Sequence, residues 1–348
     1  MKKIIILSTI VVLLITQRVQ AATTVTASGP YIPSTSISPL EAYIQLASDS
    51  LGSAMSNAYA LGNISGYPIG SSHIKKFFIG LSVNAGLTNT YYFDSTVAKS
   101  QTILPGFGVN PVIFFGFSLG ESMDLIAKVM IYNDAIYKPP IDFSPIATLT
   151  KINLYSAGAK FRYTAVKNVP IFPGLFEFGG ITLTAGVDAI YGIIGLQGTY
   201  PYTIPSIEIN IPPLTTVDLE FNPQYQMMLS WWLISPSVQA IFYFDFLWIF
   251  SLYTGFGLSV HLGSFDLNLT ASGDVTTTNA AFNLAAGTNV VSNLTATSVT
   301  GYAPSIIMPL YILGLDINLY VLQISFETMV NMLNLRDINL QIGIRSQW

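Results

Sequence analysis

The sequence predicts an all-β protein, a transmembrane antiparallel up-and-down β-barrel of about 12–14 strands with a short N-terminal helical plug. Three observations carry this prediction. Charged residues make up only 9% of the chain, against about 25% in an average soluble domain. Many segments alternate residue by residue between apolar and polar side chains. The chain also ends in an amphipathic strand whose last residue is aromatic.

The composition predicts an exterior that faces lipid. The 348 residues are 51% hydrophobic, and the mean hydropathy is +0.53. A soluble protein of this size needs a charged surface to stay dispersed, and this chain has too few charges for one. The absence of cysteine excludes disulfides, Cys-ligated metals and a lipid-modified N-terminal cysteine. The net charge of −4 argues against a nucleic-acid partner.

Residues 1–21 have the organisation of a secretory signal peptide. Lys2 and Lys3 form the positive start, residues 4–15 are apolar, and residues 19–21 end in Ala21 as a small-residue cleavage site. The apolar stretch is shorter than the roughly 20 residues that span a bilayer, which favours cleavage near Ala21 over an uncleaved membrane anchor. We therefore expect export, and the outer membrane of a diderm bacterium as the location.

Residues 22–75 are expected to form an N-terminal extended segment and the helical plug. Residues 23–38 are polar and rich in Ser, Thr and Pro. In residues 39–61 the apolar side chains recur near helical spacing and give one weakly apolar face. A loop rich in Gly, Pro and Ser follows, and residues 76–348 are expected to form the barrel.

From residue 76 onward the hydrophobic period is two. Clear alternation occurs in residues 79–87, 181–192, 250–262 and 313–322, and weaker candidates are residues 112–119, 123–132, 155–163, 217–231 and 238–244. Successive side chains of a strand point to opposite faces, so one face suits lipid and the other a packed or wet lumen. Alternating segments of about ten residues are typical of transmembrane strands.

A bundle of transmembrane helices is the rival architecture. Residues 221–244 are uncharged and long enough, but they contain two prolines and many polar side chains. Residues 234–237, Ile-Ser-Pro-Ser, are predicted as a hairpin turn between two strands. Residues 134–148, 166–180, 197–213 and 273–301 are expected to be long loops at the outer face, because barrels of this kind have short turns at one end only.

Six charged or titratable residues fall on the polar phase of their candidate strands and are predicted to line the lumen. They are Asp124, Lys128, Asp188, Asp245, His261 and Asp316. A charge that faces lipid costs about 2–4 kcal/mol at mid-depth, and a lumen position avoids this cost. Asp124 and Lys128 lie four residues apart, so they either belong to a charge ladder that shapes ion preference or pair with neighbours and hold the barrel in shape. The second interpretation is favoured.

The last strand is predicted to direct barrel assembly. Apolar residues alternate with polar ones from Ile338 to Arg345, and Trp348 ends the chain in phase with Ile342 and Ile344. A terminal strand of this kind resembles the signal that the barrel-insertion machinery reads. Its physical task is to pair with the first strand, which removes an exposed edge. Expected partners are therefore this machinery and outer-membrane lipid.

No catalytic, cofactor or metal site is predicted. The chain has two histidines, His73 and His261, and no cysteine, so no group of residues has ligand spacing. Ser259 and His261 would share the inner face of one strand, but no Gly-x-Ser-x-Gly element is present. A polar lumen side chain is the favoured interpretation of His261, and an enzyme is not expected.

The layout of a helix in residues 39–72 followed by a barrel resembles the long-chain fatty-acid channels and related outer-membrane barrels. Residues 66–81, from Gly-Tyr-Pro through His-Ile-Lys-Lys-Phe-Phe-Ile-Gly-Leu, resemble the start of the barrel in those proteins. The Asn-Pro-Ala element that such channels often carry near the mature N-terminus is absent, and no functional residue is transferred from them. The resemblance implies a plugged channel or transporter for small hydrophobic molecules.

Two other functions remain open. A non-transporting structural or surface-exposed outer-membrane protein would present the Thr/Asn-rich residues 273–301 to its surroundings. An outer-membrane esterase or phospholipase using His261 is the third.

Overall fold

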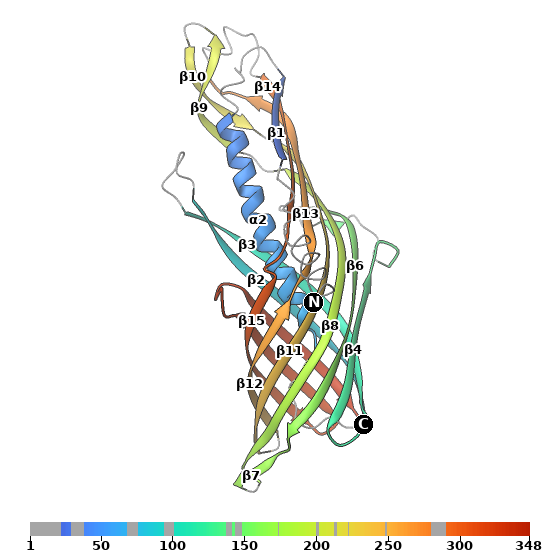
Figure 1. Ribbon diagram of the computed structural model, residues 1–348. Coiled ribbons are helices and arrows are strands. Elements are labelled where there is room, and N and C mark those ends of the chain that lie inside the picture. The colour runs from blue at the N-terminus through green and yellow to red at the C-terminus, as the bar shows by residue number, and fades with distance from the viewer. Residues whose placement is uncertain are drawn as a thin grey trace, which may run out of the picture.

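The computed structural model describes residues 22–28, 38–67, 76–93, 101–136, 141–142, 148–172, 174–199, 202–211, 214–221, 223–247, 249–279 and 290–348. The predicted signal peptide, residues 1–21, and His73 lie outside the described residues. The described chain forms one antiparallel sheet of 17 strands together with one helix, α2 (Figure 1).

The elements have the following bounds. They are β1 Ala22–Ser28, α2 Ser38–Ile64, β2 Phe77–Phe93, β3 Gln101–Ser118, β4 Met123–Tyr132, β5 Ile141–Asp142, β6 Thr148–Val166, β7 Val169–Phe172, β8 Phe176–Thr199, β9 Tyr202–Ile211, β10 Leu214–Phe221, β11 Gln224–Phe246, β12 Phe250–Val260, β13 Leu262–Thr276, β14 Val290–Tyr302, β15 Ile307–Leu319, β16 Leu322–Asn331 and β17 Ile338–Gln347.

Ten strands of the described chain close into a ring. In order around the ring they are β2, β3, β4, β6, β8, β11, β12, β15, β16 and β17. The last strand pairs with the first from Ile338↔Leu87 to Gln347↔Phe78. The predicted all-β transmembrane barrel with a helical plug is confirmed. The expected 12–14 strands lie between the ten of the described ring and the 17 of the whole described sheet.

The alternation of side chains divides the wall into two faces. On β17, Leu340, Ile342 and Ile344 are 47–54% exposed, whereas Asn339 and the other inward residues are buried. The same holds on β2, where Leu81 is 63% exposed beside the buried Ser82. An apolar band that runs around the whole exterior is far larger than a soluble surface tolerates, and it is what a lipid-facing wall requires.

Several strands continue beyond the ring and form a taller wall on one side (Figure 1). The strand β11 pairs along its full length with β8, and on its other side it pairs first with β13 and then with β12. Beyond the ring, β13 pairs with β14, which pairs with β1. The helix α2 lies against this wall and descends into the ring. Among the described residues, no helix is long and apolar enough to cross a membrane.

The hairpin turn predicted at residues 234–237 is wrong, because β11 runs straight through Pro236. At this point β11 changes partner: Ile234 faces Leu262 of β13, and Ser237 faces Ser259 of β12. Proline lacks a backbone N–H, and it is tolerated where a ladder is interrupted. The predicted helix of residues 39–61, in contrast, is present as α2.

The four expected outer loops are only partly loops. Residues 197–213 contain all of β9, and residues 273–301 contain most of β14. Residues 166–180 lie at the other end of the barrel, with β7 and the C-terminus (Figure 1). The backbone N–H of Leu247, in the short β11–β12 turn, donates to the carbonyl of Leu175 there. Pro170 and Pro173 suggested an outer loop, but this segment instead forms an extended turn at the short-turn end.

Replacing Trp348 with Ala is expected to reduce barrel closure. The Trp348 ring stacks on Phe77 at a centroid distance of 5.8 Å, and the backbone N–H of Trp348 donates to the carbonyl of Phe77 at 2.9 Å. An aromatic pair contributes about 0.5–1.5 kcal/mol beyond its buried area. The folded fraction is measured as the band that shifts between unheated and heated SDS gels. The Trp348→Phe variant should keep that band, and an equal yield from both variants would contradict the prediction.

Candidate functional site

The candidate site is the lumen position that holds the lower end of α2. The helix begins at its opposite end, where Pro39 suits the first turn and Glu41 complements the helix dipole. From residue 58 to residue 67 every residue is buried. The strands that contact this helix include β2 and β3 on one side and β13 and β14 on the other.

A glycine seat on β2 and β3 lets the helix backbone lie directly on the wall. It consists of Gly86, Gly106 and Gly108. A Cβ added to Gly86 would meet the carbonyl oxygen of Ala58 at 2.0 Å, and one added to Gly106 would meet the Ala54 backbone at 2.3 Å. Because these contacts are with backbone atoms, a side chain here has no room unless the helix moves.

Aromatic rings hold the opposite face of the helix. The Tyr59 ring lies 4.0 Å from the Trp231 ring, and Trp231 lies 5.8 Å from Phe265. All three side chains are buried. The helix is therefore clamped between the glycine seat and this aromatic group, which consists of Tyr59, Trp231 and Phe265.

The middle of the helix is tethered to β14 and to the segment that follows it. The Tyr302 hydroxyl donates to the Asp49 carboxylate at 2.5 Å, and the backbone N–H of Ser305 donates to Asn57 Oδ1 at 2.8 Å. Burial, and then the hydrogen bond to Asp49, raise the pKa of the Tyr302 hydroxyl, so it stays protonated and remains the donor. Gly52 of the helix gives the Tyr302 ring its space.

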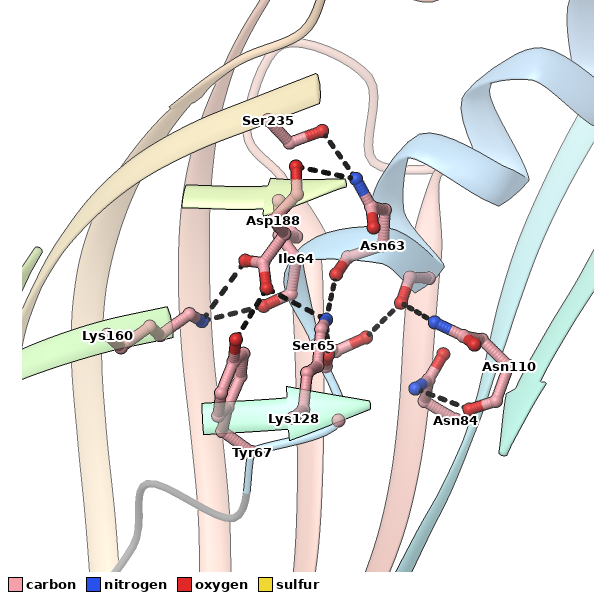
Figure 2. A network of polar contacts seen from close by, with 12 residues as sticks. Asn63, Ile64, Ser65, Tyr67, Asn84, Asn110, Lys128, Lys160, Asp188 and Ser235 are labelled. Atoms are coloured by element: carbon pink, nitrogen blue, oxygen red, sulfur yellow. Dashed lines mark hydrogen bonds and ion pairs between the residues drawn. The ribbon is translucent and has the colours of Figure 1, made fainter. Parts of the chain in front are cut away.

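The end of α2 receives its positive charge from the barrel wall. The helix has no basic residue in its last turn, although its final carbonyl groups lack partners and carry partial negative charge. Lys128 of β4 donates to the carbonyls of Asn63 and Ser65, the latter at 2.6 Å. Lys160 of β6 donates to the carbonyl of Ile64 at 2.7 Å (Figure 2).

Asp188 of β8 neutralises these two ammonium groups. Its carboxylate lies 3.0 Å from Lys128 Nζ and 4.0 Å from Lys160 Nζ, and all three side chains are fully buried. The Tyr67 hydroxyl donates to Asp188 at 2.7 Å. The ammonium groups of Lys128 and Lys160 also lie 4.7 and 4.4 Å from the Tyr67 ring centroid, within the range of cation–π attraction. Lys128, Lys160, Asp188 and Tyr67 are called the latch below.

Polar side chains around the latch complete the hold on the chain (Figure 2). Asn63 Nδ2 donates to Ser235 Oγ at 2.9 Å, and Ser235 Oγ lies 2.9 Å from His261 Nδ1. Asn110 Nδ2 donates to the carbonyl of Gly62 at 3.3 Å. The backbone N–H of Gly66 donates to Gln341 Oε1 at 2.7 Å. These residues come from strands on several sides of the ring, so the helix end is fixed by the closed barrel as a whole.

Below the latch the lumen carries a second set of polar pairs. They are Asp124 with Arg162 at 2.9 Å, Glu327 with the Tyr253 hydroxyl at 3.0 Å, Asp316 with Gln323 at 3.0 Å and Asp245 with Ser251 at 2.5 Å. A space of about 100 Å³ at the short-turn end is lined partly by Asp245 and Ser251.

The structure places all six predicted lumen residues inside the barrel, with exposures of 0–7%. Lys128, Asp188 and His261 belong to the network around the helix end, while Asp124, Asp245 and Asp316 lie apart from it. Asp124 and Lys128 do not pair with each other: Asp124 pairs with Arg162 of the adjacent β6, and Lys128 pairs with Asp188 of β8, two strands away. Ile342, Ile344 and Trp348 point outward, at 49–59% exposure. It remains a prediction that the six lumen residues line a conduction path, and that Ile342, Ile344 and Trp348 direct barrel assembly.

Several residues of the site were missed from the sequence. Lys160 and Arg162 share the inward phase of residues 155–163, so strict use of the alternation identifies them. Arg345 and Glu327 are found in the same way on β17 and β16. Tyr67, by contrast, follows the helix in an irregular segment, where no periodic signal exists.

The arrangement provides hydrogen bonds and charge pairing to the end of the helix. Within the described ranges, no group of three or more His, Asp or Glu side chains is placed to hold a metal. His261 Nδ1 pairs with Ser235, whereas Ser259 donates to the carbonyl of Pro236 at 3.3 Å. The Ser259–His261 pair considered for an esterase is therefore not joined.

Fold and site together define a class, a closed lipid-facing β-barrel whose lumen holds its own N-terminal helix. The chain belongs to the Lsa36-like family, whose model matches residues 19–348. A search of curated proteins finds no match.

Several solved structures are similar to this chain at low sequence identity. The toluene transporter TbuX of Ralstonia pickettii is 10% identical, with 86% of this chain and 94% of that chain covered and a TM-score of 0.24. The transport unit of the autotransporter AIDA-I from Escherichia coli is 10% identical, with 85% and 99% covered and a TM-score of 0.33. A Pseudomonas aeruginosa FadL homologue is 8% identical, with 84% and 96% covered and a TM-score of 0.23.

Replacing Gly86 with Val is expected to lift α2 off its seat, because the new side chain meets the Ala58 backbone. Overpacking of this kind costs about 1–3 kcal/mol. Limited proteolysis of residues 38–64 in reconstituted vesicles measures the displacement. Ala85→Val, on the lipid-facing side of the same strand, is the matched control and should leave the helix protected. Equal protection of both variants would contradict the glycine seat.

Replacing Asp188 with Asn is expected to destabilise the barrel by about 3–5 kcal/mol, because removing one partner leaves buried charge uncompensated. Urea unfolding in micelles measures the loss. Glu121→Gln is the control, since Glu121 pairs with Lys167 at 2.6 Å on the exposed surface, where the midpoint should not move. A loss no greater than that of the control would show that Asp188 does not hold the latch.

Proposed function

We propose that the chain is a plugged channel in the outer membrane of a diderm bacterium, that it passes small hydrophobic molecules, and that α2 is its gate. The observation that carries this proposal is the latch. The last turn of the helix lies inside a closed ring, and polar and charged side chains of the wall hold it there.

A polar latch suits a gate better than a continuous apolar core does. A buried ion network specifies one arrangement strongly, but it contributes little net stability compared with apolar packing of the same volume. The latch therefore defines the closed position. When the latch is released, its groups exchange their hydrogen bonds to the helix end for hydrogen bonds to water. At Gly86 and Gly106 the helix backbone meets a surface without wall side chains, which favours sliding.

The aromatic group above the latch supports a hydrophobic cargo. Trp231 and Phe265 are rigid apolar surfaces that the helix covers in the closed state, and Leu229 and Leu267 lie beside them as buried neighbours. If the helix withdraws, a small apolar molecule can occupy this surface. The resemblance of the layout to fatty-acid channels points the same way. The polar lower lumen places the limit on cargo size and charge.

The location also belongs to the proposal. The apolar exterior supports insertion in a bilayer, and the terminal strand with Trp348 supports delivery by the barrel-insertion machinery. Residues 1–21 would direct export and be cleaved near Ala21. Catalysis plays no part in this proposal.

A surface-exposed protein that transports nothing is the second candidate. The observation in its favour is the tall wall of β8, β11, β13 and β14, which rises beyond the ring and exposes polar side chains such as that of Asn293 (Figure 1). Deletion that leaves permeability unchanged, together with protease access to the β13–β14 region on intact cells, would favour this candidate.

The double variant Lys128→Met with Asp188→Asn is expected to show an ion conductance at least about tenfold higher than that of the wild type. It removes both members of the closest ion pair, so Lys160 alone loses its partner and the barrel should be perturbed less than by Asp188→Asn alone. It also removes charge-assisted hydrogen bonds of about 1.5–3 kcal/mol each from the helix end. Planar-bilayer conductance measures the opening. Lys167→Met, which breaks only the exposed pair with Glu121, should stay as closed as the wild type.

Uptake of labelled dodecanoate and labelled arabinose into vesicles then tests the cargo. Faster dodecanoate uptake with the double variant supports a hydrophobic cargo, and faster arabinose uptake alone would make the protein a pore for polar solutes. A double variant that stays sealed in every assay would overturn the channel proposal.

A further inference from the structure

The wall that carries the latch is hollowed on its lipid-facing side. A recess of about 450 Å³ spans β4, β6, β8 and β11. Its lining residues are Val129, Met130, Ile131, Tyr155, Ser156, Ala157, Ala189, Ile190, Tyr191, Trp232, Leu233 and Ile234. None of them is charged.

The strand register explains the hollow. One row of outward side chains runs Val129↔Ala157↔Ala189↔Ile234 across the four strands. The two central positions are alanines, so the wall is thinnest at the crossing of β6 and β8. The adjacent row runs Ile131↔Tyr155↔Tyr191↔Trp232, and all four of its side chains are large. The recess is therefore a shallow floor below a raised rim.

The rim marks the upper border of the apolar band. Tyr155 and Tyr191 pack at a centroid distance of 6.2 Å, and both are exposed together with Trp232. Below the rim on β8, Val187 and Leu183 face outward, whereas above it on the same strand the exposed side chains are those of Gln197 and Thr199. Tyr and Trp favour the membrane–water interface, so the floor lies on the hydrocarbon side of that border.

The recess lies back to back with the latch. On β4 and β8, an inward latch residue is the immediate neighbour of an outward recess residue: Lys128 precedes Val129, and Asp188 precedes Ala189. On β11, Ser235 follows Ile234 in the same way. Because successive side chains point to opposite faces, substitutions on the floor leave the lumen side chains unchanged.

We propose that this recess binds an acyl chain of a membrane lipid. The recess is continuous with the lipid-facing band, its lining is uncharged, and its volume falls within the 300–1,000 Å³ of typical small-molecule sites. The hydroxyls of Tyr155 and Tyr191 lie at the level where a lipid carries its ester groups, while the alanine floor accepts the chain below them. This proposal needs only the transmembrane placement of the barrel and does not depend on plug release.

Native mass spectrometry in octyl maltoside, with added dimyristoylphosphatidylcholine, tests the recess. The double variant Ala157→Phe with Ala189→Phe fills the floor, and Leu313→Phe on β15, across the ring, is the matched lipid-facing control. We expect the wild type and the control to retain one lipid and the filled variant to lose at least tenfold in occupancy. Heat-modifiable mobility on SDS gels verifies that each variant is folded.

A second measurement uses Trp232 as a local probe. Phosphatidylcholine with brominated acyl chains quenches the fluorescence of tryptophans that it contacts in vesicles. The contribution of Trp232 is the quenching that disappears in the Trp232→Phe variant. This contribution should be smaller in the milder Ala189→Leu variant. Equal lipid retention by all variants, with unchanged quenching, would overturn the proposal. Loss of a protein dimer in the filled variant alone would overturn it too, because the occupant would then be a second copy of this chain.

Discussion

The structure depends on how a helix end is satisfied inside a closed ring of strands. A helix leaves its last carbonyl groups without intrahelical partners, and inside a lumen water cannot be relied on to supply them. Here Lys128 and Lys160 donate to the carbonyls of residues 63–65, and Asp188 balances the two charges. The three side chains come from adjacent strands of the ring. The position of the plug and the balance of charge therefore both depend on the register of these strands.

The alternation of a strand lets the same short segments serve two media. The segment around Lys128 and Val129 presents an ammonium group to the helix and an apolar side chain to lipid, and the segment around Asp188 and Ala189 does likewise. A shift of register by one residue would exchange the two faces and place the latch charges in lipid. The lipid-facing recess and the lumen latch therefore depend on the same strand register, because they use alternating residues of the same strands.

The helix is held differently on its two sides, and the difference follows from residue size. Glycines at 86, 106 and 108 bring the backbone of β2 and β3 against the helix, while Trp231 and Phe265 fill the wider space opposite. Near Pro236, β11 changes partner from β13 to β12. This change marks where the ring ends and the taller wall of β13 and β14 begins, and it therefore fixes how far above the latch Trp231 and Phe265 lie. His261 occupies the interruption and contacts the latch surroundings through Ser235.

The sequence by itself determined the class of fold, because the period of two, the scarcity of charge and the terminal aromatic strand are local properties that each residue carries with it. It also determined the inward phase of Lys128, Asp188 and the other predicted lumen residues. Only the tertiary structure decided their partners, since Lys128 meets Asp188 through two strand registers that join residues sixty positions apart. The reading of Pro236 as a turn failed for the same reason: a proline ends a strand only if its N–H is needed, and the neighbouring strands decide that.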